Sequence, residues 1–248
     1  MRVREIETPR PNRRRGEKQI AGLMSIEHHE LGEKVYTLIR EQILLRRFQA
    51  GEKLDIYRLA DQLGVSRTPV KDAVNRLALE GLVEIVPRRG TFVTKFGARE
   101  VEELFDARRM VELWAAQKAI EKATEQDIRQ LENLVREGEK ILKKADNGKF
   151  DYQSFSALNA RFHRRMLELS GSQKLVDIYD SLHTHVQVTR AMAQRALEAC
   201  RLAQEEHEKI VAAYKQRDLK QLEAAIITHL ESTLEGSLKV VEERGGVL

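Results

Sequence analysis

Three histidines in the C-terminal half of the chain have the residue type and setting of metal ligands. His163 lies in LNARFHRRML, His207 opens HEKIVAAYK, and His229 lies in AAIITHLES. Each is flanked by apolar residues, so each imidazole is expected to face a core, where converging neutral imidazoles can hold a divalent transition metal. The same pattern also fits three separate core histidines that are merely hydrogen-bonded, and spacing alone does not decide between the two.

Asn159 lies one helical turn before His163, so the two side chains are expected to share a helix face. A hydrolytic site, in which the ion activates water, is a second interpretation of the histidines. His207 is followed by Glu208, but Val211 stands where the HExxH motif of metalloproteases requires its second histidine. The sequence shows no phosphate-binding loop, no nucleophile elbow and no companion general base at a known spacing, so we do not expect an enzyme.

A second group of functional residues lies in LGVSRTPVKDAV, residues 63–74. Ser66 precedes the first helical turn, where its hydroxyl could accept a hydrogen bond from the Thr68 N–H. Pro69 at the third helical position removes no internal hydrogen bond, because the first four N–H groups of a helix have no partner within it. The remaining N–H groups and the positive end of this helix suit a phosphate.

The helix that starts here is expected to have one polar and one buried face. Arg67, Lys71 and Asn75 recur every fourth residue on the polar face. The buried stripe is predicted to contain Val70, Ala73, Val74 and Leu77. Arg67 could present its guanidinium to a guanine in the major groove, whose O6 and N7 atoms accept two hydrogen bonds. Ser66 and Thr68 are better suited to phosphate oxygens.

Residues 30–96 are expected to form a winged helix-turn-helix around this segment. Apolar residues recur at helical spacing over residues 31–46 and 56–63. Gly64 is in position to end the second of these helices in a left-handed turn.

The wing is predicted in GLVEIVPRRGTFVTKF, where two short strands of β-branched residues flank a Pro-Arg-Arg-Gly turn. Gly90 would let this turn come close to the DNA backbone. Arg88 and Arg89 could reach the adjacent minor groove or its phosphates.

The chain after Gly97 is expected to be wholly helical. Helices are predicted near residues 98–122, 125–145, 150–170, 173–198, 200–216 and 218–240, which together would form an all-α six-helix bundle. Thr124 and Asp127 resemble a capping box, with aspartate in place of the usual glutamate. The predicted fold class is therefore mainly α, with a winged helix-turn-helix of residues 30–96 and a helical domain of residues 97–248.

The charge of the chain is unevenly distributed. Residues 1–20 carry seven Lys/Arg and three Glu, and residues 31–96 carry twelve Lys/Arg and eight Asp/Glu, whereas residues 97–248 have a net charge of −2. A basic front half favours a polyanionic partner such as double-stranded DNA, although an uneven solvated surface would give the same counts. We expect residues 1–29 to be a mobile basic arm, either without a role or adding phosphate contacts.

Several protein classes are disfavoured by composition. The single cysteine, Cys200, excludes an intramolecular disulfide and a cysteine-based zinc site. No run of about 18 apolar residues is present, and the polar N-terminus is not a secretory signal. We therefore expect a cytoplasmic protein.

The stretch LADQLGVSRTPVKDAVNRLALEGLVEIVPRRGTFV, residues 59–93, resembles the DNA-binding domain of GntR-type bacterial transcription regulators. The resemblance implies DNA contacts from Ser66, Arg67, Thr68, Lys71, Arg89 and Gly90, to which its place in the wing adds Arg88. Tyr57 stands where some relatives carry a phosphate-binding arginine, so it is left out of the predicted contacts.

The helical domain is similar to the FCD ligand-binding domain of the FadR-like branch of these regulators. The match is carried by ELFDARRMVE, NARFHRRMLELSGS, EEHEKIVAAYKQRD and AAIITHL. Many members bind a metal through an Asp or Asn and three His, which implies Asn159, His163, His207 and His229 as ligands here. The asparagine oxygen is a neutral and weaker ligand than aspartate, and three imidazoles favour zinc or nickel over magnesium.

Arg108 matches an arginine of the first FCD helix that can pair with the carboxylate of an effector. Its alternative role is a salt bridge to a neighbouring acid. His183 and His185, two residues apart, cannot share a helix face, and one of them could line the pocket.

The resemblance implies a transcription regulator, expected to be a repressor, that binds a palindromic operator as a homodimer. A small carboxylic-acid effector bound near the metal in the dimerisation domain would control DNA binding. A third interpretation, an architectural DNA-binding protein with a purely structural helical domain, would predict no response to ligands.

Overall fold

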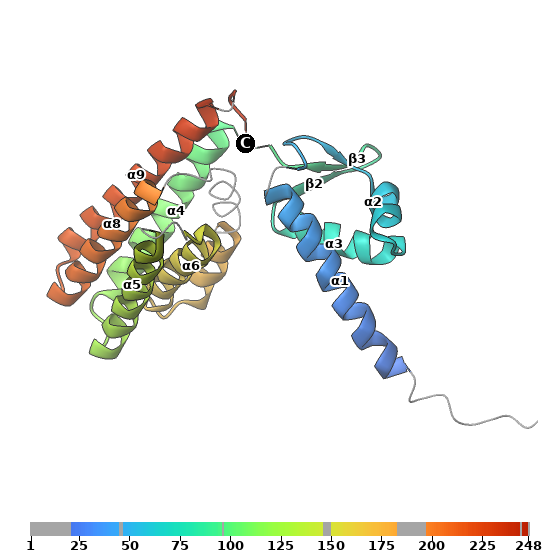
Figure 1. Ribbon diagram of the computed structural model, residues 1–248. Helices are drawn as coiled ribbons and strands as arrows, with labels where there is room; N and C mark the ends of the chain where they lie inside the picture. The colour runs from blue at the N-terminus through green and yellow to red at the C-terminus, as the bar shows by residue number, and fades with distance from the viewer. Residues whose placement is uncertain are drawn as a thin grey trace, which may run out of the picture.

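The computed structural model describes residues 21–44, 47–95, 97–145, 150–182, 197–243 and 245–247. Figure 1 shows two bodies, an N-terminal one of three helices with a small sheet and a C-terminal one made of helices. The chain passes from one to the other just after the last strand, close to the C-terminus. The predicted fold class, a winged helix-turn-helix followed by a helical bundle, is confirmed.

The N-terminal body contains α1 (Ala21–Leu44), α2 (Ile56–Leu63) and α3 (Arg67–Leu79), with strands β1 (Lys53–Leu54), β2 (Val83–Val86) and β3 (Gly90–Val93). The three strands form an antiparallel sheet in the order β1-β3-β2. Strand β1 was not predicted, because its two residues are too few to show an alternating pattern. Helix α1 begins at Ala21, so the arm predicted for residues 1–29 is helical from residue 21, where alanine, leucine, methionine and glutamate favour a helix. Residues 1–20 lie outside the described residues.

The helix-turn-helix is held by the apolar stripe that the sequence predicted. Buried residues of α3 include Val70, Ala73, Val74 and Leu77, each at most 1% exposed. They meet Val35, Ile39 and Ile43 of α1, which are also buried. Gly64 ends α2 with φ of 65°, the left-handed conformation expected of it.

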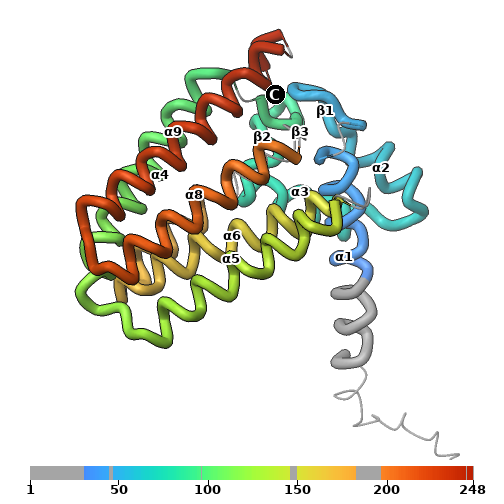
Figure 2. The backbone as a smooth tube through the Cα atoms, turned by 60° about the vertical axis from the view of Figure 1, so that its left-hand side comes forward, coloured from blue at the N-terminus to red at the C-terminus, as the bar shows by residue number. Residues whose placement is uncertain are grey.

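The C-terminal body contains α4 (Ala98–Ala119), α5 (Glu125–Ala145), α6 (Tyr152–Glu168), α8 (Leu197–Gln216) and α9 (Leu219–Glu243), together with a helical segment at residues 173–182. Helix α9 packs against α4 and α8, and α5 packs against α6 and α8 (Figure 2). Of the helix predicted at 173–198, residues 173–182 are described as a helix, whereas residues 197 and 198 belong to α8, so the predicted break at residue 199 is wrong. His183 and His185 lie outside the described residues.

The helix starts in this domain follow local capping chemistry. As predicted, Thr124 and Asp127 cap α5 reciprocally: the Thr124 N–H donates to Asp127 Oδ2 at 2.8 Å, and the Asp127 N–H donates to Thr124 Oγ1 at 3.2 Å. At α6, Asp151 accepts a hydrogen bond from the Ser154 N–H at 3.0 Å.

Besides Ser170, Gln204 and Ser237, the described bundle interior contains one larger group of buried polar side chains. These are Arg108, Glu112, Asn159, His163, Glu206, His207 and His229, each at most 5% exposed. Burying polar groups costs free energy unless each finds a partner, so their concentration in one region marks the candidate site.

Among the described residues, no helix is both long enough and apolar enough to cross a lipid bilayer.

Candidate metal centre and DNA-binding face

Three helices bring the predicted histidines together in the bundle core. His163 comes from α6, His207 from α8 and His229 from α9, and they are 0%, 3% and 0% exposed. The Nε2 atom of His163 lies 3.3 Å from Nε2 of His207 and 3.1 Å from Nε2 of His229. One ring nitrogen from each histidine lies within 4.8 Å of those of the other two.

These separations fit a shared metal ion. Two ligand atoms that are each about 2.0–2.1 Å from zinc lie about 3.3 Å apart at a tetrahedral angle and about 2.9 Å apart at a right angle. The two measured Nε2–Nε2 distances, 3.1 and 3.3 Å, fall in this interval. The three-histidine cluster is therefore a candidate metal centre.

Two buried carboxylates orient the rings of this cluster. Glu112 Oε2 lies 3.1 Å from Nδ1 of His163, and Glu206 Oε2 lies 2.8 Å from Nδ1 of His229. A neutral imidazole that donates its Nδ1 hydrogen to a carboxylate keeps a free lone pair on Nε2, so both Nε2 atoms are presented as ligands. Phe162 stacks on the His207 ring with centroids 4.2 Å apart and limits its movement.

Glu206 is itself held in place by a second contact. Ser232 Oγ donates a hydrogen bond to Glu206 Oε1 at 2.7 Å. Burial raises the pKa of the Glu206 carboxyl, while the hydrogen bond from Ser232 and the charge of Lys209 act in the opposite direction. Sequence reasoning missed Glu112 and Glu206, although Glu206 directly precedes a predicted ligand.

The predicted effector residue, Arg108, lies beside the cluster and is 1% exposed. Its Nε forms an ion pair with Glu112, the same carboxylate that contacts His163. The alternative role considered for Arg108, a salt bridge to a neighbouring acid, is thus present. Its two terminal nitrogens are also buried, and Tyr179 acts on the guanidinium together with Glu112. Effector binding by Arg108 stays a prediction.

Asn159, the fourth predicted ligand, is 5% exposed and lies on the same helix as His163. A cavity of about 10 Å³ is lined by both Asn159 and His207. The Nδ2 atom of Asn159 has no hydrogen-bond partner in the described part of the chain. Metal ligation by Asn159 also stays a prediction.

The predicted DNA contacts lie on the exposed side of α3. Ser66, Arg67, Thr68 and Lys71 are all exposed, opposite the buried stripe of the helix. Ser66 occupies the N-cap position, but its side chain makes no capping hydrogen bond, so the predicted bond from the Thr68 N–H is wrong. The first N–H groups of α3 therefore keep their hydrogen-bonding capacity for another acceptor.

Tyr57 of α2 lies under the predicted base-reading residue. The guanidinium carbon of Arg67 is 4.8 Å from the centroid of the Tyr57 ring, within the range of a cation–π contact. Tyr57 is 68% exposed, so it shares the outer face with Arg67. Tyr57 is not among the predicted contacts, since some relatives carry a phosphate-binding arginine at this position, and its place beside Arg67 depends on the angle between two helices.

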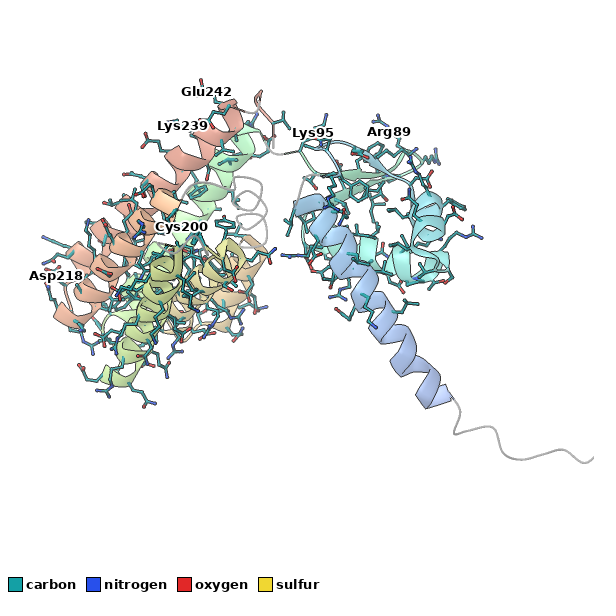
Figure 3. All side chains as sticks on the ribbon, viewed as in Figure 1. Arg89, Lys95, Cys200, Asp218, Lys239 and Glu242 are labelled. Carbon is teal, nitrogen blue, oxygen red and sulfur yellow. The ribbon has the colours of Figure 1, made fainter. Side chains whose placement is uncertain are left out.

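The wing presents its arginines on a tight turn between β2 and β3. The Arg89 N–H donates to the Val86 carbonyl at 3.1 Å, and Arg88 has a positive φ of 63°, which costs free energy in a residue other than glycine. Gly90 has φ of 122°, and a Cβ there would lie 2.8 Å from Cε of Lys53. Figure 3 labels Arg89 on this outer edge of the sheet. Lys53, which sequence reasoning missed, is brought to the wing by β1.

Comparison with known families agrees with both halves of this architecture. Residues 31–93 match the bacterial regulatory proteins of the gntR family, and residues 103–232 match the FCD domain. The chain belongs to the GntR family of bacterial transcription regulators. Its N-terminal domain is therefore a DNA-binding domain, and its C-terminal domain is an FCD domain.

Individual relatives share this role. The chain is 27% identical over 200 residues to the Nta operon transcriptional regulator of Aminobacter aminovorans, covering 81% of this chain and 90% of that protein. It is 26% identical over 214 residues to the transcriptional repressor RspR of Escherichia coli, covering 86% and 91%. These relatives and both domains are those of transcription regulators, so the GntR-family chain is not an enzyme.

Solved structures show the same fold. The structure of McbR/YncC from Escherichia coli matches with a TM-score of 0.65 at 22% identity, covering 87% of this chain and 99% of that one.

Proposed function

We propose that this GntR-family regulator is a repressor that binds a palindromic operator as a homodimer and responds to a small carboxylic acid. The observation that carries the proposal is the convergence of three histidine Nε2 atoms beside the buried guanidinium of Arg108. The relative RspR is named a repressor, which supports this sign of regulation. Because its target is chromosomal DNA, we place the protein in the cytoplasm.

The DNA-binding face would act through three kinds of contact. Arg67 would read a guanine in the major groove, and Ser66, Thr68 and Lys71 would bind phosphates around it. Arg88, Arg89 and Gly90 would bring the wing to the neighbouring backbone or minor groove. Two copies related by a twofold axis would place their α3 helices about 34–36 Å apart, one turn of DNA.

The metal site would be formed by Asn159, His163, His207 and His229. The nitrogen-rich set, with carboxylates behind two of the rings, fits zinc or nickel better than magnesium. When bound, such a metal supplies open coordination positions that can take carboxylate or hydroxyl oxygens of an effector.

Arg108 would select the carboxylate of that effector. Its Nε is already paired with Glu112, which fixes the plane of the guanidinium. The two buried terminal nitrogens, next to Tyr179, form the fork that carboxylates bind bidentately. The effector would change DNA affinity only if it binds the DNA-competent and incompetent arrangements of the dimer differently.

The test is DNA binding by fluorescence anisotropy, using an operator selected from random sequence with the intact protein. We expect tight, salt-dependent binding to the selected site and a change in affinity when a pool of small carboxylic acids is added. Inserting five base pairs between the half-sites should abolish tight binding, because it turns one half-site to the opposite side of the DNA. Operator binding that no acid pool alters would contradict effector control and favour an architectural protein.

A further inference from the structure

A second cavity lies on the side of the bundle formed by α6, α8 and α9. It has a volume of about 120 Å³. Phe155, Cys200, Leu202 and Ala203 supply its apolar wall, and Figure 3 labels Cys200 on α8. No residue of α4, the helix that carries Arg108, lines it. The cavity is therefore separate from the proposed carboxylate receptor.

The volume limits what this cavity can hold. An apolar cavity of about 150 Å³ in another protein is large enough for benzene. A cavity of about 120 Å³ therefore suits a ligand with about four to six carbon atoms.

The polar part of the wall offers hydrogen-bond acceptors. Ser232 Oγ donates to the Glu206 carboxylate at 2.7 Å, Thr233 Oγ1 to the His229 carbonyl at 2.7 Å, and Ser237 Oγ to the Thr233 carbonyl at 2.8 Å. The hydroxyl hydrogens of these three α9 residues are thus already used within the protein, and their oxygens offer lone pairs to a ligand.

Glu206 adds a carboxylate to the same wall, and with the hydroxyl oxygens it forms the acceptor side of the cavity. A ligand that complements this side must bring a hydrogen-bond donor, which a carboxylate lacks. Asn159 also lines the cavity and is 5% exposed, and its Nδ2 has no partner within the described residues. A buried amide without a partner is costly, which points to an acceptor supplied by a ligand.

Gly236 keeps the cavity open. It lies inside the 25-residue helix α9, where glycine is less favourable than alanine. A Cβ built at Gly236 would meet no atom within 4 Å, so the described surroundings contain nothing that excludes a side chain there. Gly236 is one of the residues that line the cavity, so the space that a side chain would occupy there is part of the cavity.

We propose that this cavity is a second ligand site, which binds a small, mostly apolar alcohol or amine of about four to six carbons. The donor of the ligand would face Glu206 and the hydroxyl oxygens of α9, its oxygen or nitrogen would accept from Asn159, and its carbons would lie against Phe155 and Ala203. The site lies next to the metal centre, because Glu206 also contacts His229 at 2.8 Å.

The test is saturation-transfer NMR with isobutanol, isobutylamine and isobutyrate as probes. Isobutanol or isobutylamine should receive saturation from the protein, and isobutyrate should not. The Gly236→Leu variant, which fills the cavity from α9, should lose the signal. So should Ala203→Leu, which fills it from α8 and serves if the first variant does not fold.

Lys239→Leu is the matched control, since Lys239 is an exposed residue of the same helix, labelled in Figure 3. This variant should keep the saturation-transfer signal that the unchanged protein gives with isobutanol or isobutylamine. Binding of isobutyrate that is as strong as that of isobutanol, or probe binding that both filling variants leave unchanged, would overturn the proposal. The probes need neither DNA nor a carboxylic-acid effector, so this result is independent of the proposed regulatory function.

Discussion

At the scale of single residues, the carboxylates behind the histidines determine how well the cluster can bind a metal. Glu206 contacts Nδ1 of His229 at 2.8 Å and is held by Ser232. A carboxylate in this position makes the imidazole more basic and fixes its orientation. It also keeps the ring in the tautomer whose Nε2 can ligate. A conservative substitution of Glu206 should therefore weaken metal binding although every ligand is still present.

We predict that Glu206→Gln weakens zinc binding by about 10-fold, because the amide keeps the shape but not the charge of the carboxylate. Competition with a chromophoric chelator measures the dissociation constant. Glu231→Gln is the control, since Glu231 of α9 is an exposed partner of Arg109 and contacts none of the three histidines. Equal zinc affinity of Glu206→Gln and the unchanged protein would show that this carboxylate does not support the metal site.

Tyr57 should support DNA binding without touching DNA, because its ring holds the Arg67 guanidinium in a cation–π contact. We predict that Arg67→Ala costs about 1–3 kcal/mol of specific binding, and that Tyr57→Ala costs about 0.5–1 kcal/mol by freeing the guanidinium. Tyr57→Phe should retain most of the affinity, because the ring face remains.

Anisotropy titrations with the selected operator, and with one in which its guanines are replaced, measure both affinity and discrimination. Arg99→Ala is the matched control, because Arg99 is an exposed arginine at the start of α4 that pairs with Glu103. Discrimination between the two DNA sequences that survives in Arg67→Ala would rule out this residue as the base reader.

At the scale of the elements, local signals predicted the helices well. The buried stripe of α3 and the left-handed end of α2 at Gly64 need only neighbouring residues, so the sequence contains them. Strand β1 exists only through its pairing with β3, and that pairing brings Lys53 to the wing. Such features depend on tertiary contacts and cannot be found from spacing.

The metal cluster also combines features that neighbouring residues predict with features that depend on tertiary contacts. That the three histidines face a core followed from their apolar neighbours, whereas their convergence followed only from family resemblance. Glu112 approaches His163 from α4, 51 residues earlier in the chain, and no local pattern connects the two.

The cap of α5 gives a pH-dependent prediction. Hydrogen bonds from Thr124 lower the pKa of Asp127, and Arg165 adds to the effect. Since the folded pKa lies below the ordinary value, the charged cap stabilises the fold above that value, and this contribution is lost as the pH falls through the folded pKa. We predict that Asp127→Ala costs about 1 kcal/mol of stability at pH 7 and that the difference shrinks in acid.

Urea unfolding of both proteins at pH 7 and below pH 4 measures this difference. Asp106→Ala serves as the control, because Asp106 is exposed within α4 and caps no helix. A destabilisation by Asp127→Ala that is the same at both pH values would contradict the assigned role of the charge.

At the scale of the whole molecule, the metal should act as a cross-link of the helical domain. Its proposed ligands come from α6, α8 and α9, which are contributed by segments between residues 152 and 243. A metal that binds only this folded arrangement stabilises it by mass action, by about 2.7 kcal/mol when its free concentration is 100 times the dissociation constant.

We therefore predict that zinc or nickel raises the melting temperature of the intact protein and that a chelator reverses the change. The double variant His163→Ala/His207→Ala should bind no metal by elemental analysis and should melt at the same temperature with and without it. Comparing each protein with itself separates metal binding from the cost of the two cavities that the substitutions create. One metal ion per chain in the double variant, or a melting temperature of the unchanged protein that metal does not alter, would remove the proposed centre and with it the control of DNA binding through this domain.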